Sequence, residues 1–404
     1  MPVNILMLGT LISQEQSEKF LTMGIRPAPA DIVQKYLLEG LETDERVGEI
    51  TVISSPRIPY FPKSKVKKVR GCIFNIGKAK ICEVGFNNFP GLGFMQREKG
   101  IVFEAKQWAK ENQNTQSIVI LYSMHSPFLR AAREIKKINP NVLIAMIVPD
   151  LPQYMSKKQG VAKILKSIDQ KRIYKYLSVV DKYILYTKHM AEYLHLEETS
   201  WMVLEGLIDT RKIVLQDKIE TNPRVCLYAG SFSTQYAIDK LIIAFEESNV
   251  DAELHLYGNS IEASKLMKQF PHCKKTKYMG MLSQSAIFEK MREATLLLNP
   301  RPSNLGLAKY SVPSKTFEYM ASGTPILMTK LPGIPEEYYS HLYFFADESV
   351  ASFKEELERV LSYDNSVLFQ KGKNAAVFLK ENKACEKQTK KILDFCIENR
   401  DFNE

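Results

Sequence analysis

The residues best suited to chemistry lie at the start of a predicted helix. Pro313 and Ser314 mark this start, and the helix places Lys315 and Glu318 on or near its polar face. The backbone N–H groups at a helix start, here up to that of Thr316, carry partial positive charge, and the Lys315 ammonium is positive as well. Together they favour the binding of a diphosphate. The Glu318 carboxylate is suited to accept hydrogen bonds from a ribose diol. The alternative is a capped surface helix with a Lys315–Glu318 ion pair.

Further candidate residues directly follow predicted strands. Ligands of open α/β sheets bind beyond the carboxyl ends of the strands, so the first residues after each strand are informative. In the first half of the chain these residues are Gly9-Thr10, His125, Asp150 and Glu205-Gly206, and in the second half they are Gly230-Ser231, Gly258-Asn259, Gly280 and Pro300-Arg301.

Each candidate in the first half has two interpretations. Gly9 could let backbone amides approach a diphosphate or serve only a tight turn, and the lack of a G-x-G-x-x-G motif disfavours a dinucleotide-binding dehydrogenase. His125 precedes a helix begun by Ser126 and Pro127, and it could contact a sugar or acceptor hydroxyl or be structural. Asp150 lies between two prolines and could orient an acceptor hydroxyl or only bond its own turn.

Short apolar runs alternate with amphipathic stretches, which indicates β-α units on parallel sheets. The predicted strands of the first half are 4–8, 49–54, 117–122, 142–148, 182–185 and 201–204, with helical patterns between them. The predicted strands of the second half are 224–229, 253–257, 277–279, 296–299, 325–328 and 342–345. The polar stretch 216–223 is the predicted linker, and the pattern from Val350 onward is helical.

A length of 404 residues favours two domains of about 150 to 200 residues each. We predict Rossmann-like domains at 1–215 and 222–384, and a last helix at 385–404 that could cross back to the first domain. The predicted fold class is therefore α/β, with two doubly wound sheets that face an interdomain cleft.

The composition is that of an ordinary globular protein, with 45% hydrophobic and 25% charged residues. The six cysteines include no C-x-x-C pair, which favours reduced thiols in a cytosol. The amino terminus lacks the basic n-region of a signal peptide, and no apolar run reaches the roughly 18 residues that a membrane helix needs. We therefore expect a cytoplasmic protein.

The net charge of +9 is partly concentrated in residues 63–70, which contain four lysines and one arginine. Such a run indicates an anionic partner, and the candidates are the inner face of the plasma membrane, phosphorylated substrates or nucleic acid. Nucleic acid is the least favoured, because the run lacks interleaved aromatic residues. The alternative is a solvated loop.

The segment 313–325, Pro-Ser-Lys-Thr-Phe-Glu-Tyr-Met-Ala-Ser-Gly-Thr-Pro, resembles the donor-site helix of family 4 of the retaining GT-B glycosyltransferases. The resemblance is strongest to bacterial members that build capsular and exopolysaccharide repeat units. It covers most of the chain from about residue 115 to 345, with weaker landmarks at 204–209, 228–232, 256–258, 278–280 and 331–338.

This resemblance implies roles for the candidate residues. In the second domain it places Glu318 on the ribose, the helix start at Ser314 and Lys315 near the diphosphate, and the Gly280 turn against the base. From the first domain, Gly9 would face the diphosphate.

The chain also departs from the family pattern. Tyr310 stands where the family has the first of two glutamates, and Ser231 and Tyr236 stand where it has an arginine and a lysine. Lys315 must then neutralise the diphosphate, with Arg301 or Lys309 as a candidate helper.

The implied reaction transfers a hexosyl group from a nucleoside-diphosphate sugar, with UDP as the favoured nucleotide, to a glycan or lipid-linked acceptor. Configuration would be retained, and the product would serve surface polysaccharide biosynthesis. The first domain would bind the acceptor near Asp150, the second would bind the donor, and His125 would lie near the donor sugar. We expect no cofactor and no metal, since the chain has no Asp-x-Asp motif.

Two other functions stay open. A non-catalytic GT-B subunit that binds a partner transferase or a glycan is suggested by the missing basic pair and the missing glutamate. A GT-B sugar-nucleotide epimerase is less favoured, because the donor helix matches such enzymes poorly.

Overall fold

The computed structural model describes residues 2–23, 25, 29–153, 161–215, 223–306 and 308–397. The chain divides into two compact units, the first comprising Met1–Leu207 with Cys385–Glu404 and the second comprising Ile208–Ala384.

The first unit ends at Leu207 rather than at the predicted residue 215. Two backbone contacts explain the difference, because Ile208 forms a parallel bridge with Ala384 and the Val214 N–H donates to the Ala321 carbonyl. These contacts tie the segment after Leu207 to the second unit. Residues 216–222 of the predicted linker lie outside the described residues.

The first unit is built on a sheet of eight strands. Their order is β10 (Trp201–Val203), β9 (Lys182–Leu185), β8 (Leu143–Val148), β7 (Ser117–Tyr122), β1 (Val3–Gly9), β2 (Val47–Ser54), β5 (Ala79–Glu83) and β4 (Cys72–Ile76). Neighbouring strands pair in parallel except at one edge, where β4 is antiparallel to β5. The carboxyl ends of the parallel strands therefore share one edge of the sheet.

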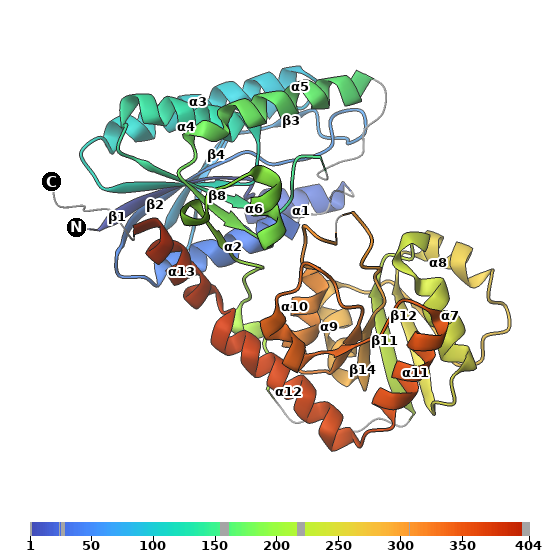
Figure 1. The fold of residues 1–404 in the computed structure, drawn as a ribbon. Helices are drawn as coiled ribbons and strands as arrows, with labels where there is room; N and C mark the ends of the chain where they lie inside the picture. The colour runs from blue at the N-terminus through green and yellow to red at the C-terminus, as the bar shows by residue number, and fades with distance from the viewer. Residues whose placement is uncertain are drawn as a thin grey trace. The chain divides into compact units, whose positions relative to one another are not determined.

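Helices cover both faces of this sheet (Figure 1). One face carries α2 (Pro29–Glu42) and α13 (Cys385–Ile397), and the other carries α3 (Leu92–Glu111), α4 (Ser126–Ile138) and α5 (Val161–Tyr176). The unit also contains α1 (Gln14–Thr22) and α6 (Lys188–Leu194). Alternate strand residues point to opposite faces, so Ile5 and Met7 of β1 enter the core formed with α2 and α13.

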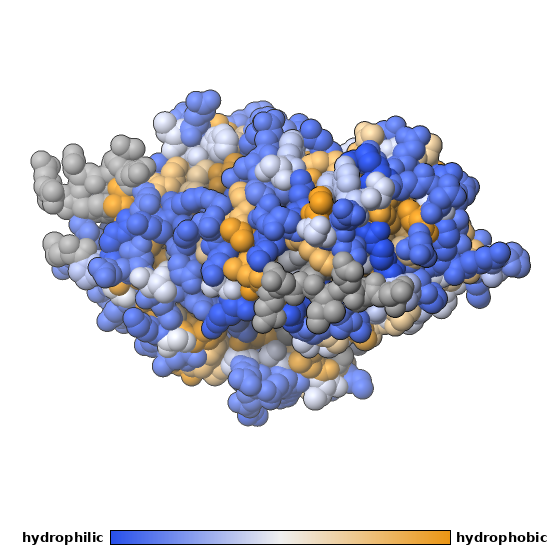
Figure 2. Space-filling model, turned by 90° about the horizontal axis from the view of Figure 1, so that it is seen from below, coloured by the Kyte–Doolittle hydropathy of each residue, from blue (hydrophilic) through white to orange (hydrophobic). Residues whose placement is uncertain are grey.

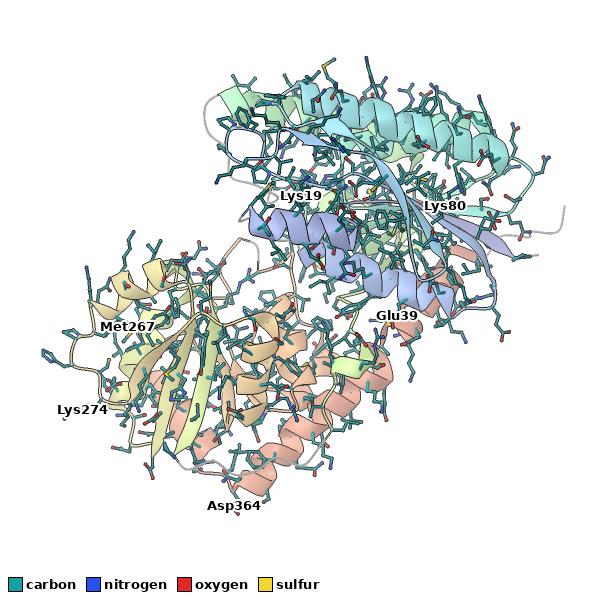
Figure 3. All side chains as sticks on the ribbon, turned by 180° about the vertical axis from the view of Figure 1, so that it is seen from behind. Lys19, Glu39, Lys80, Met267, Lys274 and Asp364 are labelled. Atoms are coloured by element: carbon teal, nitrogen blue, oxygen red, sulfur yellow. The ribbon has the colours of Figure 1, made fainter. Side chains whose placement is uncertain are left out.

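The last helix, α13, packs closely against α2. A Cβ atom at Gly40 of α2 would stand only 2.6 Å from the Cys385 backbone oxygen, so the two helix backbones approach at this glycine. Glu39, labelled in Figure 3, lies on the same stretch of α2. Burial, with smaller effects of Glu386 and Glu39, raises the pKa of the Cys385 thiol to about 12.

The prediction of helical patterns alone between residues 54 and 117 is wrong. The structure has four strands there, β3 (Lys68–Val69), β4, β5 and β6 (Phe86–Asn87). β4 and β5 form a hairpin in which Ile76 faces Ala79, and Gly77 takes the left-handed φ of 57° that the turn requires. The signal in the sequence was a pair of alternating runs around this glycine.

The second unit contains a sheet of six strands that pair in parallel. Their order is β13 (Thr276–Gly280), β12 (Ala252–Gly258), β11 (Arg224–Gly230), β14 (Leu296–Asn299), β15 (Ile326–Met328) and β16 (Tyr343–Phe344). The chain runs outward from β11 to β13 and then returns to the other side of β11 at β14. The carboxyl edge between β11 and β14 is therefore the switch point at which ligands of such sheets bind.

Two separate cores lie on the two faces of this sheet. The helices are α7 (Ile238–Glu247), α8 (Ser260–Met267), α9 (Gln284–Glu293), α10 (Ser314–Ala321), α11 (Val350–Leu361) and α12 (Asn365–Asn382). Cys226 and Tyr228 of β11 pack with residues of α7, α8 and α11. Leu227 and Ala229 point to the opposite face and pack with residues of α9, α10 and α12.

Tyr319 of α10 fills a gap between β11 and β14. These two strands pair only at Cys226 and Leu227. Beyond this point the Ala229 N–H donates to the Tyr319 hydroxyl at 3.0 Å, and that hydroxyl donates to the Ala229 carbonyl at 3.4 Å. Tyr319 is 1% exposed. The side chain therefore fixes α10 to the end of β11 at the switch point.

No helix in the described ranges is both long enough and apolar enough to cross a bilayer. The face drawn in Figure 2 is covered mostly by hydrophilic residues, with hydrophobic residues in small groups.

Replacing Tyr319 by phenylalanine should destabilise the second unit. The change removes the hydroxyl that satisfies a buried N–H and a buried C=O, and such a loss costs about 1 to 3 kcal/mol. Urea unfolding followed by circular dichroism measures the change. Tyr339→Phe is the matched control, because the structure gives the Tyr339 hydroxyl no hydrogen bond within the described residues. Equal stability of the two variants would contradict the role assigned to Tyr319.

Candidate functional site

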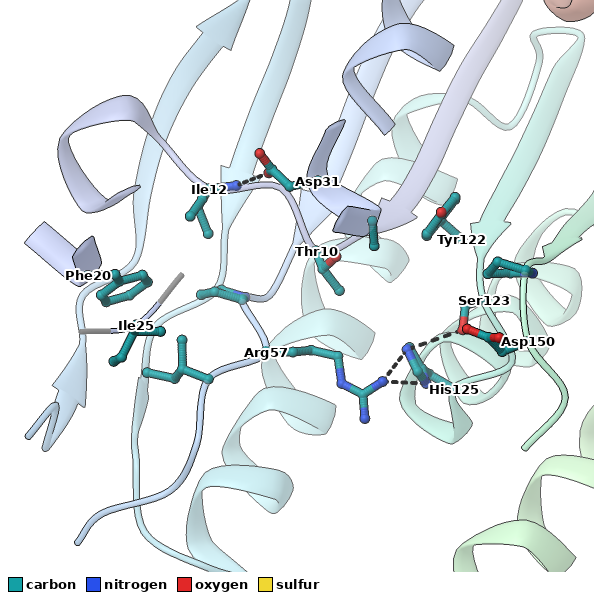
Figure 4. Close-up of a pocket in the computed structure, with 14 residues that line it drawn as sticks. Thr10, Ile12, Phe20, Ile25, Asp31, Arg57, Tyr122, Ser123, His125 and Asp150 are labelled. Atoms are coloured by element: carbon teal, nitrogen blue, oxygen red, sulfur yellow. Dashed lines mark hydrogen bonds between the residues drawn. The ribbon is translucent and has the colours of Figure 1, made fainter. Parts of the chain in front are cut away.

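A pocket lies at the carboxyl edge of the first sheet, where β1, β7 and β8 end side by side (Figure 4). Its cavity volume is about 320 Å³, near the lower end of small-molecule sites. The structure brings the predicted residues His125 and Asp150 together in its lining. Gly9 itself does not line the pocket, but Thr10, the next residue, does.

Gly9 has a packing reason to be glycine. A Cβ atom there would lie 2.2 Å from Oε1 of Gln34 on α2. Gln34 accepts a hydrogen bond from the Thr10 N–H at 2.8 Å and donates to the Thr10 hydroxyl at 2.9 Å. The Ile12 N–H donates to Asp31 at 3.3 Å. Two amides that follow β1 are therefore already hydrogen-bonded to α2, and the contact of Gly9 with a diphosphate stays a prediction.

His125 is held by a strained turn after β7. Ser123 has a φ of 83°, a left-handed value that costs about 1 to 3 kcal/mol for such a residue and is typical of functional sites. The His125 N–H donates to the Ser123 carbonyl at 2.9 Å, and the Ser123 hydroxyl lies 3.4 Å from Nε2 of the ring. The turn thus presents the half-buried imidazole to the pocket.

Arg57, which follows β2, points toward the His125 ring (Figure 4). Its Nη1 lies 2.6 Å from Nε2 and 3.2 Å from Nδ1. Desolvation lowers the pKa of His125 well below 6.5, and the positive charges of Arg57 and Arg97 lower it further. The imidazole is therefore neutral at neutral pH, and Nε2 accepts the hydrogen bond from Arg57.

Asp150 lies at the end of β8, on the exposed rim of the pocket. Desolvation raises the pKa of its carboxyl. Its charge in turn contributes to the raised pKa of Tyr122 and of Tyr186, whose hydroxyls are hydrogen-bonded to each other. Asp150 can therefore accept a hydrogen bond from a ligand hydroxyl in the pocket.

In the second unit, the start of α10 stands at the switch point described above. Lys315 Nζ lies 4.0 Å from Glu318 Oε2, and the two side chains are 38% and 37% exposed. The ion pair of the alternative interpretation is therefore formed, but it is loose and open to a ligand. Thr316 is buried, and its N–H donates to the Pro313 carbonyl at 2.9 Å, so this amide is already used. The Ser314 side chain lies outside the described part of the chain.

Arg301 follows β14 and is a half-buried cation. Its guanidinium lies 5.9 Å from the centre of the Tyr236 ring, and its Nε is buried without a hydrogen-bond partner. Desolvation lowers its pKa, while Tyr236 and Tyr228 act in the opposite direction. The structure gives Arg301 no carboxylate partner within residues 223–306 and 308–397. A desolvated guanidinium of this kind is suited to a phosphate.

The loop after β11 is closed by a carboxylate that the sequence did not indicate. Glu262 of α8 accepts from the Ser231 hydroxyl and from the Phe232 N–H, both at 2.8 Å. A Cβ atom at Gly230 would lie 2.5 Å from the Tyr228 hydroxyl. Gly230 is therefore explained by its packing against the Tyr228 hydroxyl, which donates to the Ser231 carbonyl, and its contact with a ligand stays a prediction.

Gly280 ends β13 with a φ of 94° and open space around the position of a Cβ atom. Three apolar side chains beside it are exposed, namely Met279, Met281 and Leu282. This surface can pack against a flat ring. Within the described residues, no group of three or more His, Cys, Asp or Glu side chains is placed to hold a metal ion.

Arg57 is the pocket residue that the sequence analysis missed. It stands three positions after the predicted strand 49–54, so the rule that found His125 and Asp150 could have found it. The intervening Ser55 and Pro56 hid it, because tertiary packing decides at which residue this loop turns back toward the pocket.

Residues 223–363 match the family model described as glycosyl transferases group 1. No curated protein matches the chain in sequence. The match confirms the prediction of a glycosyltransferase and places its family domain in the second unit.

Solved structures of similar fold cover nearly the whole chain. The lipopolysaccharide outer core galactosyltransferase WaaB, in its apo form, has a TM-score of 0.64 and 15% identity, and covers 97% of this chain and 99% of its own. HepE from Anabaena, in complex with UDP and glucose, has a TM-score of 0.58 and 13% identity, with coverages of 97% and 98%. A trehalose-6-phosphate structure from E. coli, bound with UDP-2-fluoro glucose, has a TM-score of 0.61 and 9% identity, with coverages of 98% and 99%. These likenesses confirm the predicted GT-B fold.

The neutral state of His125 can be tested by its titration. Because the folded protein disfavours the protonated imidazole of His125, the NMR signal of this ring should not titrate near pH 6.5. The stability that neutral His125 contributes is present above pH 6.5 and is lost as the pH falls below it. Arg57→Gln removes one positive neighbour and should raise the pKa, while burial keeps it below 6.5.

Histidine ring NMR between pH 5 and 8 measures this titration. Arg133→Gln, an exposed change of equal charge on α4, is the control and should leave the His125 signal unchanged. Titration of His125 near pH 6.5 in the unaltered protein would contradict the prediction.

Proposed function

We propose that this chain, a glycosyltransferase whose residues 223–363 belong to the glycosyl transferases group 1 family, moves a hexosyl group from a UDP-sugar to a glycan or lipid-linked acceptor. The configuration at the anomeric carbon is retained, and the product serves surface polysaccharide biosynthesis. Two similar structures support this choice: the Anabaena protein was solved with UDP and glucose, and WaaB is named for lipopolysaccharide synthesis.

One observation carries the proposal. The start of α10 stands at the switch point of the second sheet with the exposed ammonium of Lys315, and the unpaired guanidinium of Arg301 follows the neighbouring strand. Two cations and a helix start together can neutralise a diphosphate. Arg301 thereby supplies the charge that Ser231 and Tyr236 lack.

The chemistry is electrostatic. The acceptor hydroxyl oxygen forms a bond to the anomeric carbon while the bond from that carbon to the diphosphate oxygen breaks. The hydroxyl proton passes to the departing diphosphate on the same face of the sugar. Lys315 and Arg301 stabilise the negative charge that grows on the diphosphate, so no carboxylate pair is required. We propose that the reaction needs no cofactor and no metal, because these cations provide the charge.

The remaining residues bind and orient the substrates. Glu318 accepts hydrogen bonds from the ribose diol, and the apolar surface around Gly280 packs against the base. In the first unit, the neutral His125 contacts a hydroxyl of the donor sugar, and Asp150 orients the acceptor hydroxyl.

We further propose that the protein works in the cytoplasm at the inner face of the plasma membrane. The five cations of residues 63–70 are exposed, while Val66 and Val69 between them are buried in a small core. The run is therefore a fixed surface and not a solvated loop. Lys68 and Arg70 line a groove that also contains Lys99 of α3, and a row of fixed cations attracts anionic lipid headgroups.

Lys315→Ala should lower the turnover of the donor about 100-fold, since the loss of one preorganised donor to a developing oxyanion costs about 3 kcal/mol. The measurement is release of nucleoside diphosphate from a panel of UDP- and GDP-sugars, in the presence of EDTA. Lys380→Ala, an exposed change on α12, is the matched control and should keep full activity.

Near-normal turnover of the Lys315→Ala protein would remove this residue from the mechanism. Release of no nucleotide from any donor would favour a non-catalytic binding subunit instead.

Replacing Lys68, Arg70 and Lys99 by glutamine should weaken binding to vesicles of anionic phospholipid. Each cation near a charged bilayer contributes about 1 kcal/mol, so the triple change should cost about 100-fold in affinity. Co-sedimentation measures the binding, and raised salt should abolish it. The same change at Lys265, Lys268 and Lys274 of the second unit is the control, and equal loss in both variants would contradict a specific surface.

A further inference from the structure

We propose that the pocket of the first unit is built for an acceptor that carries a negative charge, a carboxylate or a phosphate on a sugar, and that Arg57 binds this group. The inference rests on the proposed transferase function and names the chemical class of its acceptor. Neither the family match nor the similar structures assign a role to Arg57.

Arg57 is a pocket residue without an ion-pair partner. Within the described residues, the structure gives it no carboxylate within ion-pair distance, and its side chain is hydrogen-bonded to the neutral ring of His125. An arginine normally presents five donors to acceptors such as carboxylates and phosphates. Most of its donor capacity is therefore directed at whatever enters the pocket.

A second guanidinium makes the surroundings of Arg57 more positive. Arg97 of α3 donates to the Tyr60 hydroxyl at 2.5 Å and to the Pro56 carbonyl at 3.4 Å, which are neutral groups. Desolvation and the charge of Arg97 both lower the pKa of Arg57, whereas Asp169 only partly offsets them. Asp169 itself accepts a hydrogen bond from the Ser126 hydroxyl. A bound anion would relieve this excess of positive charge.

The carboxylates of the pocket do not supply that anion. Asp31 is paired with Lys35 at 2.7 Å and accepts from the Ile12 N–H. Asp150 lies two residues after β8, and within the described residues it forms no ion pair with Arg57. The pocket therefore has a basic end at Arg57 and an acidic rim at Asp150. This polarity suits a ligand with an anion at one end and a hydroxyl at the other.

The size and the walls of the pocket restrict the ligand further. Apolar side chains form the side opposite His125, namely Ile12, Phe20 and Ile25, and Ile58 also lines the pocket. Together with a cavity volume of about 320 Å³, they leave room for a sugar ring whose apolar face lies on this wall. An acidic sugar unit fits the pocket better than a lipid chain, because a lipid chain leaves Arg57 unpaired.

The test compares three probes that differ in charge: glucose, glucuronate and glucose 6-phosphate. Their affinities are measured by NMR titration of the whole chain. We expect both anions to bind at least 10-fold more tightly than glucose, since hydrogen bonds to charged groups are the stronger class. Arg57→Gln should remove this preference, and Arg57→Lys should restore part of it. Arg133→Gln, with the same change of charge outside the pocket, should keep the preference.

Binding of one anion alone identifies the group, a carboxylate for glucuronate and a phosphate for glucose 6-phosphate. Equal affinity for all three probes would overturn the proposal, and so would an Arg57→Gln protein that still prefers the anions. The circular dichroism spectrum of each variant shows whether the protein is folded. Release of nucleotide from a UDP-sugar is followed separately in the unaltered protein. Anion preference without such release would refute the transferase function but leave the anion site standing.

Discussion

The site in the second unit depends on one buried hydroxyl. β11 and β14 stop pairing after Leu227, and Tyr319 enters the gap to bond both polar groups of the Ala229 backbone. An unsatisfied backbone group in this place would be costly, so the tyrosine fixes the position of α10 relative to the sheet. Lys315, one turn earlier on the same helix, is thereby held at the switch point. A helix attached only by apolar contacts would leave the position of this ammonium less well defined.

Both units keep an arginine without a carboxylate partner in the described residues, and of the two only Arg301 is half-buried, while Arg57 is exposed. Arg301 follows β14 in the second unit, and Arg57 follows β2 in the first. Desolvating a cation costs free energy that a bound anion offsets. The two arginines share one physical explanation, in which the substrates supply the missing negative charges. In the two proposals above, a diphosphate binds beside Arg301 and Lys315, and a charged acceptor binds beside Arg57.

The departures from the family pattern become intelligible in the structure. Ser231, which stands at the place of a basic residue, is hydrogen-bonded to Glu262. Tyr236, at the place of the second basic residue, lies against the guanidinium of Arg301. In the proposed function, Arg301 from the loop after β14 supplies a positive charge that the family pattern supplies from the loop after β11. Such an exchange would return one of the two missing positive charges to the site from a different strand.

The sequence by itself determined the two parallel sheets, because apolar strands and amphipathic helices alternate in a period that local physics fixes. It also determined the start of α10 and the residues directly after most strands, including His125 and Asp150. Only the tertiary structure decided which of these side chains meet. The pairing of Arg57 with His125, the Tyr319 bond to β11 and the use of the Thr316 amide depend on contacts between residues far apart in the chain or on exact turn geometry. Periodicity carries no information on such contacts, so they became visible only when the elements packed.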